Sequence, residues 1–350
     1  MKLCKKCGFI LGTKPGLQER DGICLACINH EKKRSIDFEA RQRWLTQYIA
    51  ENKTSEKYDC LVAVSGGKDS TTIVKKLFEN HGVEKALLFN ITDEFTKTVA
   101  GGHNINNIVN IFNCDLITFR INPRELAEHM RKDFMESLNP LKYLEEQIYL
   151  APIEAAKNYG IKLVFFGENA GYEYGSFESL DIYHPATTDE TRIIYMGAVY
   201  PYSANVWYDE ASTVGFLDLD CFNEWQRQGA IENYSQIDSI GYHMGIWTKF
   251  VKFGYQRVSD IACRQVREGL LTREQAVQLI QDKDYICDPA SKRDFCWTIG
   301  ITEEYFNEVV DEHANHDLVS KDINGNWRRK DLIYPVVSIS NNFREYSLSQ

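Results

Sequence analysis

The stretch CLVAVSGGKDSTTIVKKLF, residues 60–78, decides the fold. It reads as an apolar strand, a glycine turn and a helix. In the turn, residues 65–70, two glycines let the backbone approach an anion, two serines offer hydroxyls, and the following helix points its amide dipoles at the charge. Asp69 lies inside this anion nest, which indicates that a cation such as Mg²⁺ is shared with phosphate groups. The turn is not a Walker A loop, because an aspartate follows its lysine and only two glycines precede it.

Three further apolar runs follow the first strand, at residues 85–91, 114–121 and 161–169. Helical stretches separate the runs, at 69–80, about 97–112, 123–138 and 140–159. Apolar strands without polar alternation, spaced by helices, predict a parallel sheet covered on both faces. We therefore expect a doubly wound, Rossmann-like α/β domain, whose ligands bind beyond the carboxyl ends of the strands. The turn and the sequence FFGEN, residues 165–169, both fall at such ends and are expected to form one site.

The composition argues against several classes of protein. The formal net charge is -10 and the pI is about 5.4, so the surface repels polyanions and a general nucleic-acid binder is disfavoured. No stretch approaches the roughly 18 apolar residues of a membrane span, and the apolar run near the N-terminus is too short for a signal peptide. We expect a cytoplasmic protein with no membrane partner.

Four of the ten cysteines, Cys4, Cys7, Cys24 and Cys27, form a C-x2-C-x16-C-x2-C pattern. This spacing is typical of a zinc site. Four thiolates with no open position indicate a structural metal rather than a catalytic one. The alternative, a pair of disulfides, is disfavoured in a reducing cytoplasm. The other six cysteines have no CxxC partner and are expected to be single buried thiols.

Changes in composition and periodicity along the sequence predict four regions. We expect a zinc-binding knuckle at 1–35, the nucleotide-binding α/β domain at 36–170, an aromatic-rich substrate region inserted after the last parallel strand at 171–256, and a helical C-terminal region at 257–350. In the last part, Thr272-x-x-Gln275 reads as a capping box ahead of an apolar helical stripe.

SGGKDS after a buried first strand resembles the pyrophosphate-binding signature of the PP-loop ATP pyrophosphatases, also called adenine nucleotide alpha hydrolase-like proteins. Two later stretches narrow the resemblance, FFGENAGYEYG at 165–175 and KFGYQRVSDIACRQVREGLLTREQAV at 252–277. Together with the cysteine knuckle, they are similar to the N-acetyl sugar amidotransferases of bacterial surface-polysaccharide biosynthesis (WbpG/PseA type). The resemblance runs from Cys4 to about residue 285 and is loose in its middle.

This resemblance implies an AMP-forming reaction. ATP is split between its α and β phosphates, and AMP is left on the acetamido oxygen of a nucleotide-linked sugar, often a diacetamido uronic acid. Ammonia then displaces AMP and yields an acetamidino group, in lipopolysaccharide O-antigen or related surface-glycan biosynthesis. The activation is needed because an amide carbonyl is resonance-stabilised and its oxygen is a poor leaving group.

The resemblance also implies roles for individual residues. Lys68, Asp69 and Glu168 are the expected catalytic residues, and Asp69 and Glu168 the expected Mg²⁺ ligands. ATP is expected to contact the turn and the end of the last strand, at Ala63, Val64, Ser65, Gly66, Gly67, Lys68, Asp69, Ser70, Gly167 and Asn169. For Glu168 and Asn169, a plain capping or turn role is the alternative.

The residues that bind the sugar are harder to name. Aromatic rings suit a sugar or a base, although packing beneath long loops is an equal alternative. The candidates are Tyr172, Tyr174, Phe177, Tyr183, Tyr195, Tyr200, Tyr202, Trp207 and Tyr208. Lys249, Lys252 and Arg257 could fold over the triphosphate or lie on a solvated face. Arg192 could meet a uronate carboxylate.

The source of ammonia is expected to be a separate glutaminase, as the relatives imply. Lys2 stands where an N-terminal-nucleophile glutaminase has its cysteine, and no cysteine lies in a G-x-C-x-G turn. Two other functions stay open. The acidic pI and the lack of a second, late CxxC pair argue against a PP-loop tRNA-thiolating enzyme. The intact Asp69 argues against a non-catalytic nucleotide-binding subunit.

Overall fold

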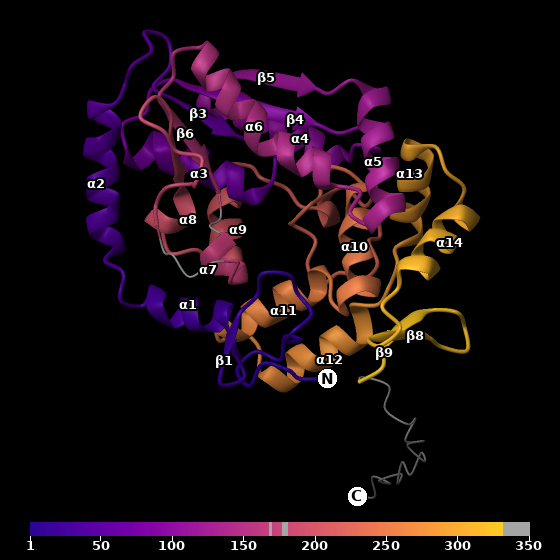
Figure 1. Ribbon diagram of the computed structural model, residues 1–350. Helices are drawn as coiled ribbons and strands as arrows, with labels where there is room; N and C mark the ends of the chain where they lie inside the picture. Colours follow the sequence, from indigo (N-terminus) through magenta and orange to yellow (C-terminus); the bar gives the residue numbers. More distant parts are fainter. Residues whose placement is uncertain (168–169, 177–180, 332–350) are drawn as a thin grey trace, which may run out of the picture.

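The computed structural model describes residues 1–167, 170–176 and 181–331 (Figure 1). Within these residues, the centre of the molecule is a sheet of five parallel strands in the order β5-β4-β3-β6-β7. The strands are β3 (Cys60–Ala63), β4 (Ala86–Thr92), β5 (Asp115–Arg120), β6 (Leu163–Phe166) and β7 (Arg192–Tyr195). Leu61 pairs with Leu87 of β4 on one side and with Val164 of β6 on the other. The doubly wound α/β fold expected from the sequence is confirmed.

Strand β7 corrects the expectation that the sheet ends with the run at 161–169. Its four residues follow an irregular stretch, residues 181–191, inside the region whose periodicity is weak. Ile193 and Ile194 are nevertheless fully buried, on opposite faces of the sheet. The aromatic-rich region therefore contributes a strand to the sheet instead of beginning after it.

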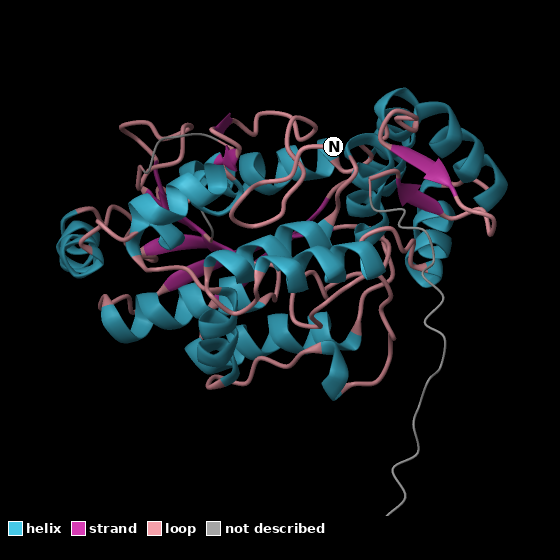
Figure 2. Cartoon of the chain, turned by 90° about the horizontal axis from the view of Figure 1, so that it is seen from below, coloured by secondary structure: helices cyan, strands magenta, loops and turns pink. Residues whose placement is uncertain are grey.

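Helices cover both faces of the sheet, as Figure 2 shows. One face packs against α2 (Phe38–Glu51), α3 (Lys68–Asn80) and α4 (Val99–Phe112). The other face packs against α6 (Lys142–Asn158). Alternate strand residues face the two layers. Val62 belongs to the first core and Leu61 to the second, and burial on both sides explains why the strands are apolar throughout.

A helical region adjoins the end of the sheet near α5 (Pro123–Ser137). It consists of α10 (Tyr242–Phe253), α11 (Arg257–Arg267), α12 (Arg273–Lys283), α13 (Pro289–Ile299) and α14 (Glu303–His313), followed by the hairpin β8 (Val319–Lys321) and β9 (Trp327–Arg329). The capping box predicted at Thr272 and Gln275 is present at the start of α12. In the part of the chain that the structure describes, no helix combines the length and apolarity needed to cross a membrane.

Short elements link the sheet to the helical region. They are α7 (Ala170–Tyr174), α8 (Met196–Val199), α9 (Ala204–Ser212) and the 3-10 helix η1 (Leu219–Cys221). Helix α10 begins at Tyr242, ahead of the expected start of the helical region at 257. The division of the chain into four parts remains a prediction.

The N-terminal segment contains β1 (Glu19–Arg20), β2 (Ile23–Cys24) and α1 (Leu25–Lys33). It packs against α11 and α12, more than 200 residues further along the chain (Figure 1). The four cysteines of the predicted metal site share one buried core with Val258, Ala262 and Ile280. The knuckle is thus fixed to the helical region.

Candidate active site

The order of the strands indicates where a ligand should bind. The sheet reverses its winding direction between β3 and β6, and ligands of such sheets bind in the crevice beyond the carboxyl ends at that point. The turn at 65–70 follows β3 directly, and Gly167 follows β6. The two stretches that the sequence assigned to one site therefore lie at adjacent strand ends.

The glycine turn has a backbone that other residues do not fit. Gly66 has a φ of +77°, and a Cβ atom there would lie 3.1 Å from the Gly101 carbonyl oxygen and from the Ile105 backbone nitrogen of α4. Gly67 caps α3, and its carbonyl oxygen accepts hydrogen bonds from the hydroxyls of Ser70 at 3.0 Å and Thr71 at 3.1 Å. The turn is held by its own residues, and the amino end of α3 is directed at the crevice.

Lys68 and Asp69 form the charged centre of the turn. Lys68 is buried, and its Nζ donates to Asp69 Oδ2 at 2.7 Å and to the Tyr202 hydroxyl at 3.2 Å. The other oxygen, Asp69 Oδ1, is buried and has no hydrogen-bond partner among the described residues. A carboxylate with one oxygen held and the other available suits a Mg²⁺ ligand. Lys68 therefore fixes the Asp69 side chain through Oδ2 and leaves Oδ1 for a ligand.

Three adjoining cavities open beside this turn. The turn cavity, of about 180 Å³, is lined by Ser65, Asp69, Ser70 and Gly167, and by Ala63. The inner cavity, of about 240 Å³, shares Ala63 and Ser65 with it and also contacts Val64. The outer cavity, of about 440 Å³, shares walls with both and has a volume within the usual range of small-molecule sites.

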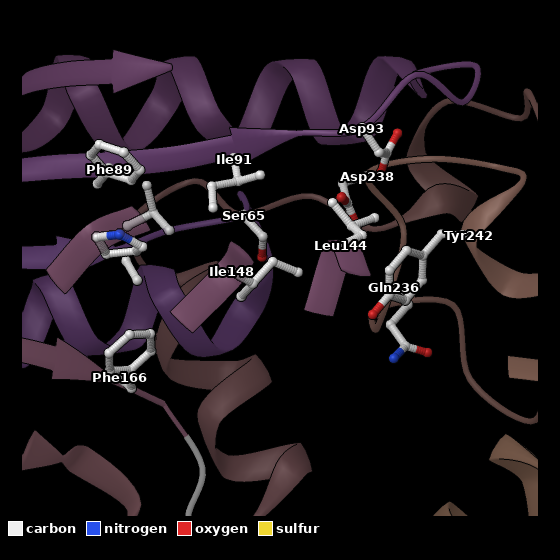
Figure 3. A pocket seen from close by; sticks show the side chains of 13 residues that line it. Ser65, Phe89, Ile91, Asp93, Leu144, Ile148, Phe166, Gln236, Asp238 and Tyr242 are labelled. Atoms are coloured by element: carbon white, nitrogen blue, oxygen red, sulfur yellow. The ribbon is translucent and has the colours of Figure 1, made fainter. Parts of the chain in front are cut away.

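The inner cavity has an apolar end and a polar end (Figure 3). Phe89, Ile91 and Phe166 line it from the sheet. At the other end lie the carboxylates of Asp93 and Asp238, with Gln236 and Tyr242 nearby. An apolar slot with a few polar groups at one end suits a flat ring such as a nucleotide base.

Asp93 and Asp238 were missed by the sequence reasoning. Asp93 accepts hydrogen bonds from the Phe95 backbone nitrogen at 3.0 Å, from Lys97 Nζ at 2.7 Å and from Ser239 Oγ at 2.9 Å. Burial, and then the neighbouring Asp93 carboxylate, raise the pKa of Asp238 to about 6. Asp93 comes one residue after the end of β4, so the rule that drew attention to the turn could have found it. Asp238 lies in irregular chain, and no sequence signal marks it.

The other predicted residues are only partly brought together. Lys249 and Arg257 line the outer cavity. Lys252 instead donates to the Ser137 carbonyl oxygen at 2.9 Å and lines none of the three cavities. Arg192 is the first residue of β7 and so lies at the amino ends of the strands, whereas the turn lies at their carboxyl ends. Its guanidinium pairs with Asp189 at 2.8 Å. Glu168 and Asn169 lie outside the described residues.

Most of the aromatic side chains proposed for the sugar belong to the core. Tyr200, Tyr202 and Trp207 are buried with α3 against the sheet, and Tyr183 packs against the same core. The weak periodicity of this region hid its burial, because the chain crosses the core in short pieces. Tyr174 and Tyr195 do line the outer cavity and the turn cavity, respectively. Tyr208 stacks on Tyr234, and the Phe177 position and the Tyr172 side chain lie outside the described part.

The four knuckle cysteines converge as the spacing predicted. Their sulfur atoms lie within 4.8 Å of one another and all four residues are buried. Cys4 Sγ is 3.9 Å from Cys27 Sγ, and Cys7 Sγ is 3.7 Å from Cys24 Sγ. Tetrahedral zinc with Zn–S bonds of about 2.3 Å separates its sulfurs by roughly 3.8 Å. All ten cysteines lie in the described residues and are free thiols, so the cluster could hold a metal ion and the disulfide alternative is wrong.

The family comparison concerns the helical region. Residues 228–332 match the family model described as LPS biosynthesis protein WbpG-like, C-terminal domain. The match covers 105 of the 350 residues, less than half of the chain. The resemblance to WbpG-type proteins expected from the sequence is confirmed over these residues, which include α10 to α14. No curated protein matches the chain significantly.

Three solved structures match the chain at a distance. NMN synthetase from Francisella tularensis is 12% identical with a TM-score of 0.38, over 71% of this chain and 93% of that one. NAD+ synthetase from Burkholderia pseudomallei is 11% identical with a TM-score of 0.36, over 74% and 96%. An NH3-dependent NAD synthetase from Campylobacter jejuni is 12% identical with a TM-score of 0.33, over 56% and 80%. These likenesses are too distant to bear on the function. The SGGKDS turn at the switch point and the WbpG-like domain support a PP-loop enzyme that uses ATP.

Proposed function

We propose that this protein is an ATP-dependent, AMP-forming amidotransferase that converts an acetamido group of a nucleotide-linked sugar into an acetamidino group. The observation that carries the proposal is the SGGKDS turn with its buried Asp69 Oδ1, which has no hydrogen-bond partner among the described residues. The turn lines the turn cavity and the inner cavity, and the outer cavity adjoins both. A nest for pyrophosphate, a slot for a flat base and a further cavity are what a reaction between ATP and a second substrate requires. The WbpG-like domain supports surface-glycan biosynthesis as the setting.

The chemistry balances in two steps. The acetamido oxygen attacks the α-phosphorus of ATP, and pyrophosphate leaves from the turn. Ammonia then adds to the imidate carbon, and AMP leaves with the former amide oxygen. The net products are an amidine, AMP and pyrophosphate. The backbone amides at 66–70 and the amino end of α3 would stabilise the charge that develops on the leaving pyrophosphate.

Mg²⁺ would be held at Asp69, with Glu168 as a second proposed ligand outside the described residues. When bound, the ion would neutralise part of the charge of the triphosphate. Asp69 Oδ1 has no hydrogen-bond partner among the described residues, and Lys68 Nζ donates to the other oxygen, Oδ2. The residues present therefore fit the ion.

The ammonia is proposed to come from a separate glutaminase. Of the ten cysteines, nine are wholly or partly buried, and burial raises the pKa of Cys60, Cys114, Cys287 and Cys296. The exposed Cys221 also has a raised pKa, from desolvation and its contact with Asp218. A thiol nucleophile needs the opposite shift. Ammonium salts should replace the partner at high concentration, with a rate that climbs as pH rises because ammonia is the reactive form.

The same cysteines argue against tRNA thiolation. None of the ten lines the turn, inner or outer cavity, so no thiol adjoins the proposed site of adenylation. The net charge of -10 also disfavours binding of a polyanion.

Product analysis tests the proposal. The protein is incubated with ATP, Mg²⁺, ammonium and a panel of nucleotide-linked N-acetyl sugars, and the products are resolved by chromatography and mass spectrometry. The expected result is AMP together with a sugar in which an NH group has replaced one oxygen atom. ADP as the main nucleotide product, or AMP formation without a change in any sugar, would refute the proposal.

A further inference from the structure

The outer cavity has an excess of cations drawn from distant parts of the chain. Lys14 comes from the N-terminal knuckle, Lys249 from α10, and Arg257 from the first position of α11. Two acidic residues, Glu145 and Asp260, also line it, so the three positive charges exceed the negative ones by one. The cavity shares Tyr149 with the turn cavity and Ile148, Gln236 and Tyr242 with the inner one. A ligand in the outer cavity would therefore border the ATP site.

Lys14 is held in place by the rings around it. Its Nζ lies 5.0 Å from the ring centroid of Tyr174, 5.4 Å from that of Phe9 and 5.5 Å from that of Tyr255. The ion pair with Asp260 Oδ1 is long, at 3.4 Å, and the Lys14 side chain is 15% exposed. The aromatic faces attract the ammonium and orient it. A long, partly solvated ion pair leaves Lys14 able to donate to an incoming anion as well.

The knuckle also positions a second wall of this cavity, through contacts of α1 with α7. Asn29 Nδ2 donates to the Gly171 carbonyl oxygen at 2.7 Å, and Lys33 Nζ donates to Glu173 Oε1 at 2.6 Å. A Cβ atom on Gly175 would lie 2.5 Å from the Ala26 backbone nitrogen, so the two segments are in direct contact. These contacts hold α7, whose last residue, Tyr174, lines the outer cavity.

We propose that the outer cavity binds the oxyanion groups of the nucleotide-linked sugar, and that the cysteine knuckle is a substrate-binding wall through Lys14. The inference rests on the proposed function and goes further, because it assigns the second substrate to a place and gives the metal-binding segment a part in specificity. Lys14, Lys249 and Arg257 meet the diphosphate or a uronate carboxylate. Tyr174 and Tyr255 supply flat faces for the sugar or the base.

Calorimetric titration of intact variants tests this assignment. The ligands are UDP-N-acetylglucosamine, its uronic acid counterpart, and ATP with Mg²⁺. Lys14→Ala should weaken binding of both UDP-sugars by about 10-fold or more, the order expected when one charge-assisted hydrogen bond is lost, and leave ATP binding within about 2-fold. Lys14→Arg keeps the charge and should recover most of the affinity.

Lys6→Ala is the matched control. Lys6 belongs to the same knuckle, but its Nζ pairs with Glu31 at 3.2 Å on the surface, where both side chains are more than 40% exposed. This variant removes the same charge from outside the cavity and should bind all three ligands as the wild type does. A larger loss for the uronic acid than for the neutral sugar would assign Lys14 to the carboxylate, and equal losses would assign it to the diphosphate.

Two results would overturn the inference. One is a Lys14→Ala protein that binds both UDP-sugars with wild-type affinity. The other is a wild-type protein that binds ATP but neither UDP-sugar. The proposed reaction is judged separately: Lys14-dependent binding of a UDP-sugar without formation of AMP would leave the binding wall in place and refute the amidotransferase.

Discussion

Replacing Glu173 by glutamine should break the link between the knuckle and α7. The Glu173 side chain is 3% exposed, with Oε1 at 2.6 Å from Lys33 Nζ and Oε2 at 3.6 Å from Arg264 Nε. Glutamine has nearly the same volume, so the packing is kept and one negative charge is lost. Two buried cations then lose this carboxylate while their own burial stays the same.

The expected cost follows from that burial. The Lys33 and Arg264 side chains are 8% and 3% exposed, so little water is available to either cation. Removing one member of a buried ion pair costs about 3–5 kcal/mol. Lys33→Met should cost less, about 1–3 kcal/mol, because the Glu173 carboxylate keeps its ion pair with Arg264.

Urea unfolding monitored by tryptophan fluorescence measures the loss, together with the rate at which zinc-loaded protein gives up its metal to a chromogenic chelator. Glu173→Gln should unfold at lower urea and release metal faster, because α1 carries both Lys33 and the cysteine Cys27. Glu79→Gln is the control. It breaks a surface pair with Lys75, one turn apart on α3, and should change the stability by no more than about 0.5 kcal/mol. If the two variants lose equal stability, the buried network does not hold the knuckle to α7.

Three further predictions concern the turn, the metal and the inner cavity. Asp69→Asn should lower AMP formation by at least about 100-fold in a protein that is still folded under assay conditions, although the loss of the carboxylate beside the buried Lys68 should lower the urea midpoint. Near-normal turnover at limiting Mg²⁺ would exclude a metal-binding role. Cys24→Ser should lose bound zinc, measured by atomic absorption, together with stability; a well-folded variant with full zinc would contradict the four-thiolate site. The pKa of Asp238 rises from 3.8 to about 6 on folding, so its stabilising contribution is complete below pH 4 and is lost as pH rises through 6. At about 1.36 kcal/mol per pKa unit, the free energy of unfolding of the wild type should fall by up to about 3 kcal/mol between pH 4 and 7 through this group. Asp238→Asn has no titrating group there and should lack this part of the fall. Parallel curves for wild type and variant in urea titrations across that range would refute the assignment.

The phosphate site could be predicted from sequence because its determinants are local. Residues 65–70 contain the glycines, the hydroxyls and the acid, and the preceding apolar run fixes their place at a strand end. The cysteine cluster was predictable for the same reason, since each CxxC pair brings two sulfurs together within one turn of chain. Strand β7 was missed because it lies in a region of weak periodicity, with only the five-residue helix α7 between it and β6 in the described part of the chain.

The second-substrate region was not predictable in the same way. Nothing in the sequence marks Lys14, and only packing of the knuckle on α11 brings it to Arg257, 243 residues later in the sequence. Tyr202 and Trp207 looked like candidates for a sugar site, but the folded chain places them in the core beneath α3. A tyrosine in weakly patterned sequence has the same appearance in both settings, and tertiary contacts decide between them.

The phosphate turn and the outer cavity therefore differ in how well they should tolerate substitution. The phosphate nest depends on backbone geometry within six residues, so almost any substitution there changes the loop itself; at Gly66 a side chain would collide with α4. The outer cavity depends on single side chains from the knuckle, α10 and α11, each on an element anchored elsewhere. A change at Lys14 or Lys249 can therefore alter which anionic sugar is bound without disturbing the turn. Because the knuckle is anchored to α11 and α12 through the core that its cysteines share with them, it can present a different residue to the cavity while α3 and the sheet remain as they are. On the proposed assignment, the cysteine knuckle is thus the part of the molecule in which specificity for the second substrate can change at the lowest cost to the phosphate turn.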